Sequence, residues 1–346
     1  MFNIFRPFIF KFSPEVAHSL AIKALKLNNF PINNFKKSKL LQVEFCGKSL
    51  SSPIGVAAGF DKNAEVYNPL FNLGFGFVEV GTITPKPQYG NPKPRVFRLE
   101  QDEALINRLG FNNSGADQIS SRILKKSKKG LLGINIGPNK DSENRIQDYI
   151  NCFRKFHKLG DYITINISSP NTEKLRDFHK QDELSTLIKK LKIEKNKLNS
   201  KVPIAVKISP DIDENQINLI SEILLENEIK AIIISNTSES SRDLLSDIQK
   251  HQKGGLSGKP IEKKSNLLIS KFYKLLKGKI KIIGVGGVDS GKTAYDKFLA
   301  GADFIQLYTG MVFKGPNIAG IIKKDLKELL IRDGVKNFTE IVGNKT

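Results

Sequence analysis

Short apolar runs alternate with longer charged segments along most of this chain. The apolar runs are residues 54–58, 76–80, 132–136, 162–167, 203–208, 231–234, 280–285 and 303–307. The segments between them include residues 181–197, 214–226 and 261–276, which are charged and amphipathic and predict helices. Because the short runs are mostly apolar and do not alternate with polar residues, they predict parallel strands that are buried on both faces.

Eight strand–helix repeats within roughly 300 residues have the size and rhythm of a (β/α)8 barrel. The alternative is an open, doubly wound sheet, which usually has fewer strands and often a glycine-rich dinucleotide turn after the first one. The first run here ends in the sequence AAGFDKN at residues 57–63, which lacks the G-x-G-x-x-G spacing. We therefore predict an α/β fold, a TIM barrel, for the main part of the chain.

Polar residues and glycines gather where each predicted strand ends. They are Lys62, Thr82, Asn135, Asn166, Ser169, Lys207, Ser235, Asn236, Thr237, Gly286, Gly287, Tyr308, Thr309 and Gly310. In a barrel of this kind the carboxyl ends of the strands converge on one face, where catalytic loops lie. The pattern therefore predicts a single site on that face.

The sequence NISSPNT at residues 166–172 is the most polar of these strand ends. Pro170 stops the preceding strand, because proline lacks a backbone N–H and has a fixed φ. Two amides and three hydroxyls thus crowd into a turn at the carboxyl end of a strand. Taken alone, the stretch is also compatible with an ordinary polar turn.

Seven motifs taken in order resemble the dihydroorotate dehydrogenase family, in its class 2, quinone-reducing and membrane-associated form. They are AAGFDKN (57–63), PRVFRL (94–99), NRLGFNN (107–113), NISSPNT (166–172), SNT (235–237), GGLSGKP (254–260) and IGVGG (283–287). The resemblance covers essentially the whole chain. Each motif is weak alone, but their joint order and spacing are specific.

The resemblance implies oxidation of dihydroorotate to orotate. A proton leaves C5, and a hydride leaves C6 for N5 of a bound FMN. Ser169 is then the general base, and because a serine hydroxyl is a poor base in water it needs a dry site and a relay, through Thr172 or an ordered water. Class 1 relatives carry cysteine at this position, so Ser169 favours class 2.

By the same resemblance, two sets of residues contact the two small molecules. The FMN set is Ala58, Thr82, Asn135, Asn166, Lys207, Ser235, Gly258, Gly287, Tyr308 and Thr309. The substrate set is Lys62, Asn107, Arg108, Leu109, Gly110, Phe111, Asn166, Asn171, Asn236 and Thr237. Asparagine amides suit a cyclic imide, because each offers both a donor and an acceptor. Lys207 would favour negative charge on the reduced flavin, and Ser235 replaces the threonine more often seen there.

The net charge of +20 raises the alternative of a nucleic-acid-binding FMN barrel, such as a tRNA dihydrouridine synthase. Most of the positive charge is lysine scattered along the predicted helices, and the motif loops lack aromatic stacking platforms. The base position would also hold cysteine in such a protein. We therefore expect no nucleic-acid partner. Neither the two cysteines nor the four histidines have a metal-ligand spacing, so no metal site is expected.

The N-terminal region differs from the rest in composition. Residues 1–40 hold seven Lys and Arg against one Glu, and five phenylalanines fall within the first twelve residues. Residues 14–27 predict a short amphipathic helix. No apolar stretch reaches the roughly 18–20 residues that span a bilayer. A helix docked on the barrel is one interpretation, and a helix pair at the membrane interface is the other.

The resemblance favours the interfacial pair, as the entrance of a quinone tunnel near His18, Arg98 and Tyr308. It implies a peripheral protein on an anionic membrane surface, at the cytoplasmic face of the inner membrane. The expected division is a helical region at residues 1–39 and an FMN-binding barrel at residues 40–340. A soluble class 1-type enzyme that uses fumarate or NAD remains the main alternative.

Overall fold

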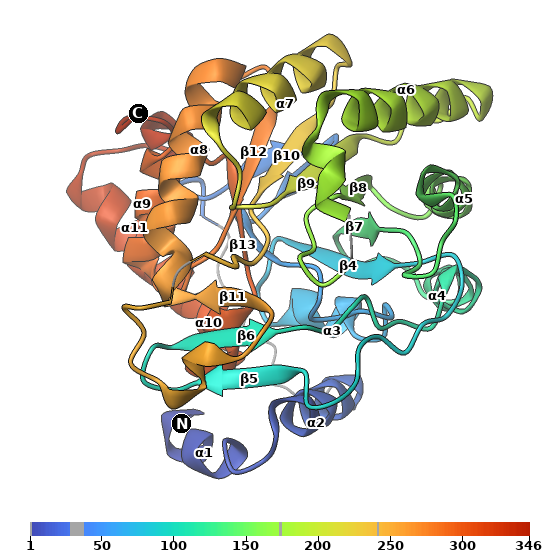
Figure 1. The fold of residues 1–346 in the computed structure, drawn as a ribbon. Helices are drawn as coiled ribbons and strands as arrows, with labels where there is room; N and C mark the ends of the chain where they lie inside the picture. The colour runs from blue at the N-terminus through green and yellow to red at the C-terminus, as the bar shows by residue number, and fades with distance from the viewer. Residues whose placement is uncertain (1, 28–37, 173–174, 241) are drawn as a thin grey trace.

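The computed structural model describes residues 2–27, 38–172, 175–240 and 242–346. Its centre is a closed eight-stranded parallel barrel (Figure 1). The strands are β3 (Ile54–Val56), β4 (Phe77–Ile83), β7 (Leu131–Ile136), β8 (Tyr162–Asn166), β9 (Ile204–Ile208), β10 (Ala231–Ile234), β12 (Lys281–Val285) and β13 (Phe304–Leu307). Each matches one of the eight predicted runs, so the predicted TIM barrel is confirmed.

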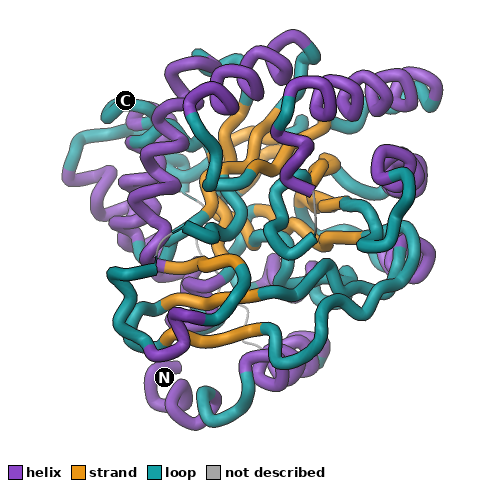
Figure 2. Tube along the Cα trace, in the orientation of Figure 1, coloured by secondary structure: helices purple, strands orange, loops and turns teal. Residues whose placement is uncertain are grey.

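Helices surround the barrel on its outer side (Figures 1 and 2). The longer helices are α3 (Tyr67–Asn72), α4 (Ala116–Leu124), α5 (Arg145–Phe156), α6 (Gln181–Lys197), α7 (Glu214–Glu226), α8 (Glu262–Leu276), α9 (Gly291–Leu299), α10 (Thr309–Lys314) and α11 (Ile318–Arg332). Short 3-10 turns are η1 (Leu175–His179), η2 (Ile248–His251), η3 (Lys259–Ile261) and η4 (Phe338–Ile341). Capping boxes at Asp213 and Ser290 begin α7 and α9, because their side chains satisfy free backbone N–H groups.

The barrel interior is layered by the alternation of side chains along each strand. The layer at the amino-terminal end of the strands is apolar and includes Phe77, Tyr162 and Phe304. A small hairpin of β1 (Val43–Phe45) and β2 (Lys48–Leu50) closes this end. Phe45 of the hairpin packs against Phe304, with 4.4 Å between ring centroids. The amino-terminal end of the barrel is therefore sealed, and the polar layers lie toward the carboxyl ends of the strands.

A three-stranded antiparallel sheet lies over the carboxyl end of the barrel (Figure 1). Its strands are β5 (Val96–Leu99), β6 (Ala104–Asn107) and β11 (Gly255–Gly258), which come from two distant loops. Phe97, Ile106 and Leu256 lie on one face of this sheet, as part of a separate hydrophobic cluster. The sheet thus makes a roof above the strand ends.

Two helices, α1 (Phe2–Ile9) and α2 (Pro14–Lys26), lie at the edge of the molecule next to β5 (Figure 1). The helix predicted at residues 14–27 is confirmed and ends one residue earlier. Several large apolar side chains of this pair are exposed, including Ile4, Phe5 and Phe8. Within the described ranges, no helix has the length and apolar character needed to cross a bilayer.

Candidate active site

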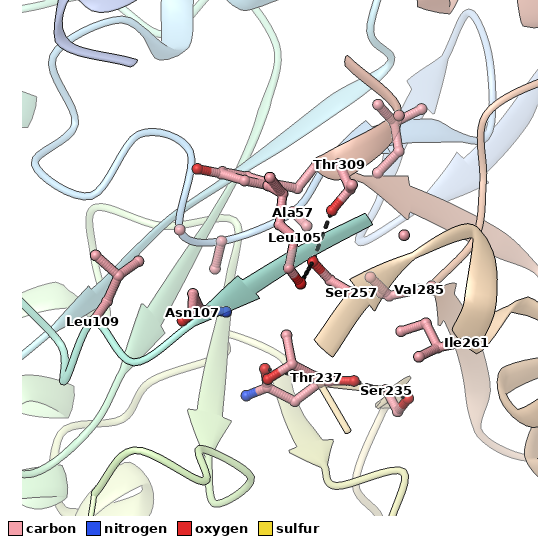
Figure 3. Close-up of a pocket in the computed structure, with 18 of the residues that line it drawn as sticks. Ala57, Leu105, Asn107, Leu109, Ser235, Thr237, Ser257, Ile261, Val285 and Thr309 are labelled. Carbon is pink, nitrogen blue, oxygen red and sulfur yellow. Dashed lines mark hydrogen bonds between the residues drawn. The ribbon is translucent and has the colours of Figure 1, made fainter. Parts of the chain in front are cut away.

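A cavity opens between the carboxyl ends of the barrel strands and the antiparallel roof (Figure 3). It brings together 18 of the residues that the resemblance assigned to the cofactor, the substrate or catalysis. They are Ala58, Lys62, Thr82, Asn107, Leu109, Gly110, Phe111, Asn166, Ser169, Asn171, Lys207, Ser235, Asn236, Thr237, Gly258, Gly287, Tyr308 and Thr309. These residues come from seven different strand ends and from the roof, so only the closed barrel makes them neighbours.

Ser169 and Asn171 lie in the turn after β8, where Pro170 ends the strand. The Ser169 hydroxyl accepts a hydrogen bond from the backbone N–H of Asn171, at 3.2 Å. The Asn171 side chain donates to the amide oxygen of Asn107 on the roof, at 3.4 Å. Thr172 is buried, but within the described ranges its hydroxyl forms no hydrogen bond with Ser169. The relay proposed for Thr172 therefore stays a prediction.

Lys207 points from β9 into the cavity and is buried. Burial lowers the pKa of its amine, because a charged ammonium loses its hydration, and the negative charge of Glu79 partly opposes that effect. Within the described part of the chain, no carboxylate lies at ion-pair distance from Lys207. A buried cation of this kind needs an anionic or polar partner, which the cavity can admit.

Asn135 lies below the cavity instead of lining it, and it is fully buried. Its side-chain oxygen accepts from the Thr82 hydroxyl at 2.6 Å and from the Asn166 amide at 3.2 Å. Its side-chain nitrogen donates to Glu79 at 2.8 Å. Asn135 therefore supports two cavity residues from beneath, and Glu79, which the sequence reasoning missed, supports Asn135.

Glycines shape the far end of the cavity, after β11 and β12. Gly258, Gly286 and Gly287 have φ values of 102°, 115° and 75°, a region that favours glycine. A Cβ at Gly258 would lie 2.4 Å from the backbone oxygen of Glu103. Close by, the Ser257 and Thr309 hydroxyls are hydrogen-bonded at 2.9 Å (Figure 3). Successive backbone N–H groups in such loops form anion sites.

At the side of the cavity facing α2, Lys62 lies next to a group of aromatic rings. Its amine donates to the backbone oxygen of Gly59 at 2.7 Å, and burial lowers its pKa to about 8. His18 of α2 contacts Phe60 and Tyr308, with 5.2 and 6.4 Å between ring centroids. Burial, and secondarily the charge of Lys62, lowers the pKa of His18 to about 3. His18 and Tyr308 therefore belong to one wall between α2 and the cavity.

Arg98 does not line the cavity; its guanidinium holds the turn after α1. The guanidinium donates to the backbone oxygen of Phe10 at 3.0 Å, and its central carbon lies 4.0 Å from the centroid of the Phe10 ring. Near it, Arg95 forms an ion pair with Glu15 of α2, with 3.0 Å between the charged atoms. Sequence reasoning missed this pair, because nothing local links residues 80 positions apart.

Arg108 requires a correction among the expected substrate contacts. Its side chain does not line the cavity. The guanidinium donates instead to the backbone oxygens of Pro94 and Lys253, at 2.9 and 3.1 Å, and lies over the ring of Phe97. Arg108 therefore ties the roof together, and its neighbours Asn107 and Leu109 line the cavity.

Comparisons with known proteins agree with this geometry. The family model of dihydroorotate dehydrogenase matches residues 40–330. A protein of Bartonella henselae named dihydroorotate dehydrogenase (quinone) is 44% identical over 339 residues, which cover 96% of this chain and 93% of that protein. A protein of Allorhizobium ampelinum with the same name is 45% identical over 341 residues, which cover 97% and 94%.

Solved structures give the same result. The crystal structure of Eimeria tenella DHODH in complex with ferulenol has a TM-score of 0.92 and 36% identity, and the match covers 96% of this chain and 95% of that one. The ligand-free structure from the same organism matches with the same TM-score. The chain therefore belongs to the dihydroorotate dehydrogenase family, in its quinone-dependent class.

Proposed function

We propose that this chain oxidises dihydroorotate to orotate with FMN as hydride acceptor, and that a membrane quinone removes the electrons. One observation carries the proposal: Ser169, the amides of Asn107, Asn171 and Asn236, and the buried cation Lys207 line the same cavity. A weak base, a set of neutral donors and acceptors, and a fixed positive charge are the groups that this reaction needs.

The residues present fit an FMN. Lys207 supplies a buried positive charge without a carboxylate at ion-pair distance in the described ranges. Gly258 and Gly287 have φ values of 102° and 75°, and a Cβ there would clash with Glu103 and Glu262, so only glycine allows these loops to present their backbone to the cavity. Lys207, Ala58, Thr82, Asn166 and Ser235 would hold the ring system, with Asn135 behind them. Gly258, Gly287, Tyr308 and Thr309 would hold the phosphate. When bound, the cofactor accepts a hydride.

The protein's own part in the reaction is to bind, orient and remove a proton. Lys62 would bind the substrate carboxylate, and the asparagine amides would match the donors and acceptors of the ring. Thr237 would add a hydroxyl contact beside Asn236. Ser169 would take the proton from C5 as general base, in a site where 5% exposure keeps the hydroxyl out of bulk water.

The N-terminal helices would bring the site to a membrane. The apolar side chains of Ile4, Phe5 and Phe8 are 78%, 56% and 63% exposed, which suits insertion at a lipid interface more than contact with water. The positive charge of residues 1–40 would favour an anionic surface. We infer a peripheral protein on the cytoplasmic face of the inner membrane, with residues 1–39 as the membrane region and 40–340 as the barrel.

One experiment tests the proposal. The protein is purified, its absorption spectrum is recorded for flavin, and dihydroorotate oxidation is measured with a quinone, fumarate or NAD as acceptor. We expect bound FMN and turnover with quinone alone. Turnover with fumarate or NAD in place of quinone would support the soluble class 1-type alternative. A protein without flavin, or flavin that dihydroorotate does not reduce, would refute the proposal.

A further inference from the structure

A buried carboxylate, Glu79, lies inside the barrel directly below the cavity. One of its oxygens accepts a hydrogen bond from the side-chain nitrogen of Asn135 at 2.8 Å. The other accepts from the Tyr162 hydroxyl at 2.8 Å, the Thr164 hydroxyl at 3.1 Å and the Gln306 amide at 3.1 Å. Four donors thus converge on Glu79, whose relative exposure is 0%. The two carboxylate oxygens of Glu79 accept all four hydrogen bonds.

This acceptor determines how the Asn135 amide is oriented. The nitrogen of Asn135 must face Glu79, so its oxygen faces the cavity side. There the oxygen accepts from the Thr82 hydroxyl at 2.6 Å and from the Asn166 amide at 3.2 Å. The Thr82 oxygen in turn accepts from Asn166 at 2.9 Å. The carboxylate therefore imposes one orientation on both amides.

The same direction of donation continues toward the substrate side of the cavity. Because its nitrogen is engaged, Asn166 presents its oxygen to Ser168, whose hydroxyl donates at 2.8 Å. The Ser168 oxygen accepts from the amide of Asn236 at 2.9 Å. Every hydrogen bond from Asn236 inward therefore points toward Glu79. Such chains polarise one another in a low dielectric, so the carboxylate affects each member.

Glu79 is also an electrostatic neighbour of the buried Lys207. Lys207 lies beside Asn166 in the register of β8 and β9. The negative charge of Glu79 favours the charged form of this amine against the cost of desolvation. It also lowers the positive potential that Lys207 presents to the cavity. One carboxylate thus acts on both the orientation and the charge of the site.

We propose that Glu79 is a positioning residue for the flavin site, which orients the Asn135–Thr82–Asn166 cluster and balances the charge of Lys207. This inference rests on the proposed function, since it assumes that the cavity binds FMN. Glu79 itself does not line the cavity and would not touch the cofactor. It would act through the residues that do.

The test compares FMN binding in Glu79→Gln, Glu79→Asp and the wild-type protein. Dissociation constants are measured for oxidised and reduced FMN, the second through the midpoint potential. Glu79→Gln removes the charge and turns the amide NH2 group, which is itself a donor, toward one or more of the four donors. We expect oxidised FMN to bind about tenfold more weakly, and the ratio of reduced to oxidised affinity to rise about tenfold, which is about 30 mV for a two-electron couple.

Glu79→Asp separates the two roles, because it keeps the charge but withdraws the carboxylate from Asn135. We expect weaker FMN binding without the rise in the affinity ratio. Glu194→Gln is the matched control: this carboxylate is buried between α5 and α6, where Arg154 binds it at 2.7 and 2.8 Å. Glu194→Gln should change the stability of the protein, but it should leave the affinity for oxidised FMN and the ratio of reduced to oxidised affinity unchanged.

The inference would be overturned if Glu79→Gln bound both oxidised and reduced FMN with dissociation constants within twofold of the wild-type values. If that variant does not fold, Tyr162→Phe provides the test, because it removes one neutral donor and leaves the carboxylate charge less screened. The affinity ratio should then fall, opposite in sign to Glu79→Gln, and an unchanged or increased ratio would overturn the inference. A wild-type protein that holds no flavin would instead refute the proposed function.

Discussion

Arg95 and Glu15 form an ion pair that joins the barrel to α2, with 3.0 Å between Arg95 Nη2 and Glu15 Oε1. The Arg95 guanidinium also donates to the backbone oxygens of Tyr89 and Asn91, at 2.6 and 2.9 Å. It is 7% exposed, so the pair is shielded on the barrel side. This contact positions α2, and with it His18, beside the cavity.

Glu15→Gln should loosen α2 while leaving the barrel folded. Loss of a hydrogen-bonded charge costs about 1–3 kcal/mol, and we expect a decrease of this size in the free energy of unfolding. The KM for quinone should rise, and flavin reduction by dihydroorotate should be unchanged. Lys26→Met is the control, because its ion pair with Glu65 is exposed and worth under about 1 kcal/mol. Equal effects of the two substitutions would contradict the prediction.

Ser169→Ala should keep FMN and orotate binding and lose most flavin reduction. The loss of a general base lowers the rate by about 10²–10⁴-fold. Stopped-flow absorbance of the flavin measures this half-reaction directly. Ser257→Ala removes another hydroxyl from the same cavity, one bonded to Thr309, and should leave the reduction rate near wild type. Reduction of Ser169→Ala at the wild-type rate would show that the base is another group.

Orotate binding should weaken as the pH rises through about 8, the pKa to which burial lowers the amine of Lys62. Below that pH the amine is charged and can bind the orotate carboxylate. Above it the charge is lost, and the dissociation constant should increase by up to about tenfold per pH unit. Titration with orotate, followed through the flavin spectrum, measures this. Lys62→Gln should bind orotate weakly and without this pH dependence. If the pH dependence persists in this variant, it arises from a group other than Lys62.

His18 should make the native state sensitive to acid. Its pKa is lowered from 6.5 to about 3 in the folded protein, so the unfolded chain binds the proton first. The contribution to stability is therefore fully present above pH 6.5 and is lost as the pH falls toward 3. His179, with a pKa lowered to about 4, acts with the same sign. Between pH 7 and 4, the free energy of unfolding of His18→Asn, measured by denaturation, should therefore fall less than that of the wild-type protein. If both proteins lose the same free energy over this range, His18 does not have this role.

Phe5→Ser combined with Phe8→Ser should weaken binding to anionic liposomes, because both rings are exposed on α1. Flavin reduction by dihydroorotate should be unaffected, since neither residue lines the cavity. Ile193→Ser is the control: this side chain is 67% exposed but lies on α6. Liposome sedimentation measures binding. If the control lowers binding as much as the double variant, α1 is not the membrane contact.

Local pattern determined the barrel strands and the helices that were predicted, which include α6, α7 and α8. A run such as residues 231–234 is apolar throughout because both faces of its strand are buried, and this requirement is visible without the partner strands. The helix α6 has the bounds that were predicted, because its amphipathic character is also a local property. Ser169, Lys207 and the asparagines could be named because strand ends in such a barrel share one face.

The tertiary structure alone decided the contacts between distant segments. The roof pairs β6 with β11, about 150 residues apart, and its short strands carry too little periodicity to be recognised singly. Arg108 was expected at the substrate and binds the roof instead, because the orientation of one side chain depends on its final neighbours. Glu79 reads in sequence as one acid in an apolar run. Only closure of the barrel brings four donors from three other strands to it, and a buried carboxylate is stable only with such partners.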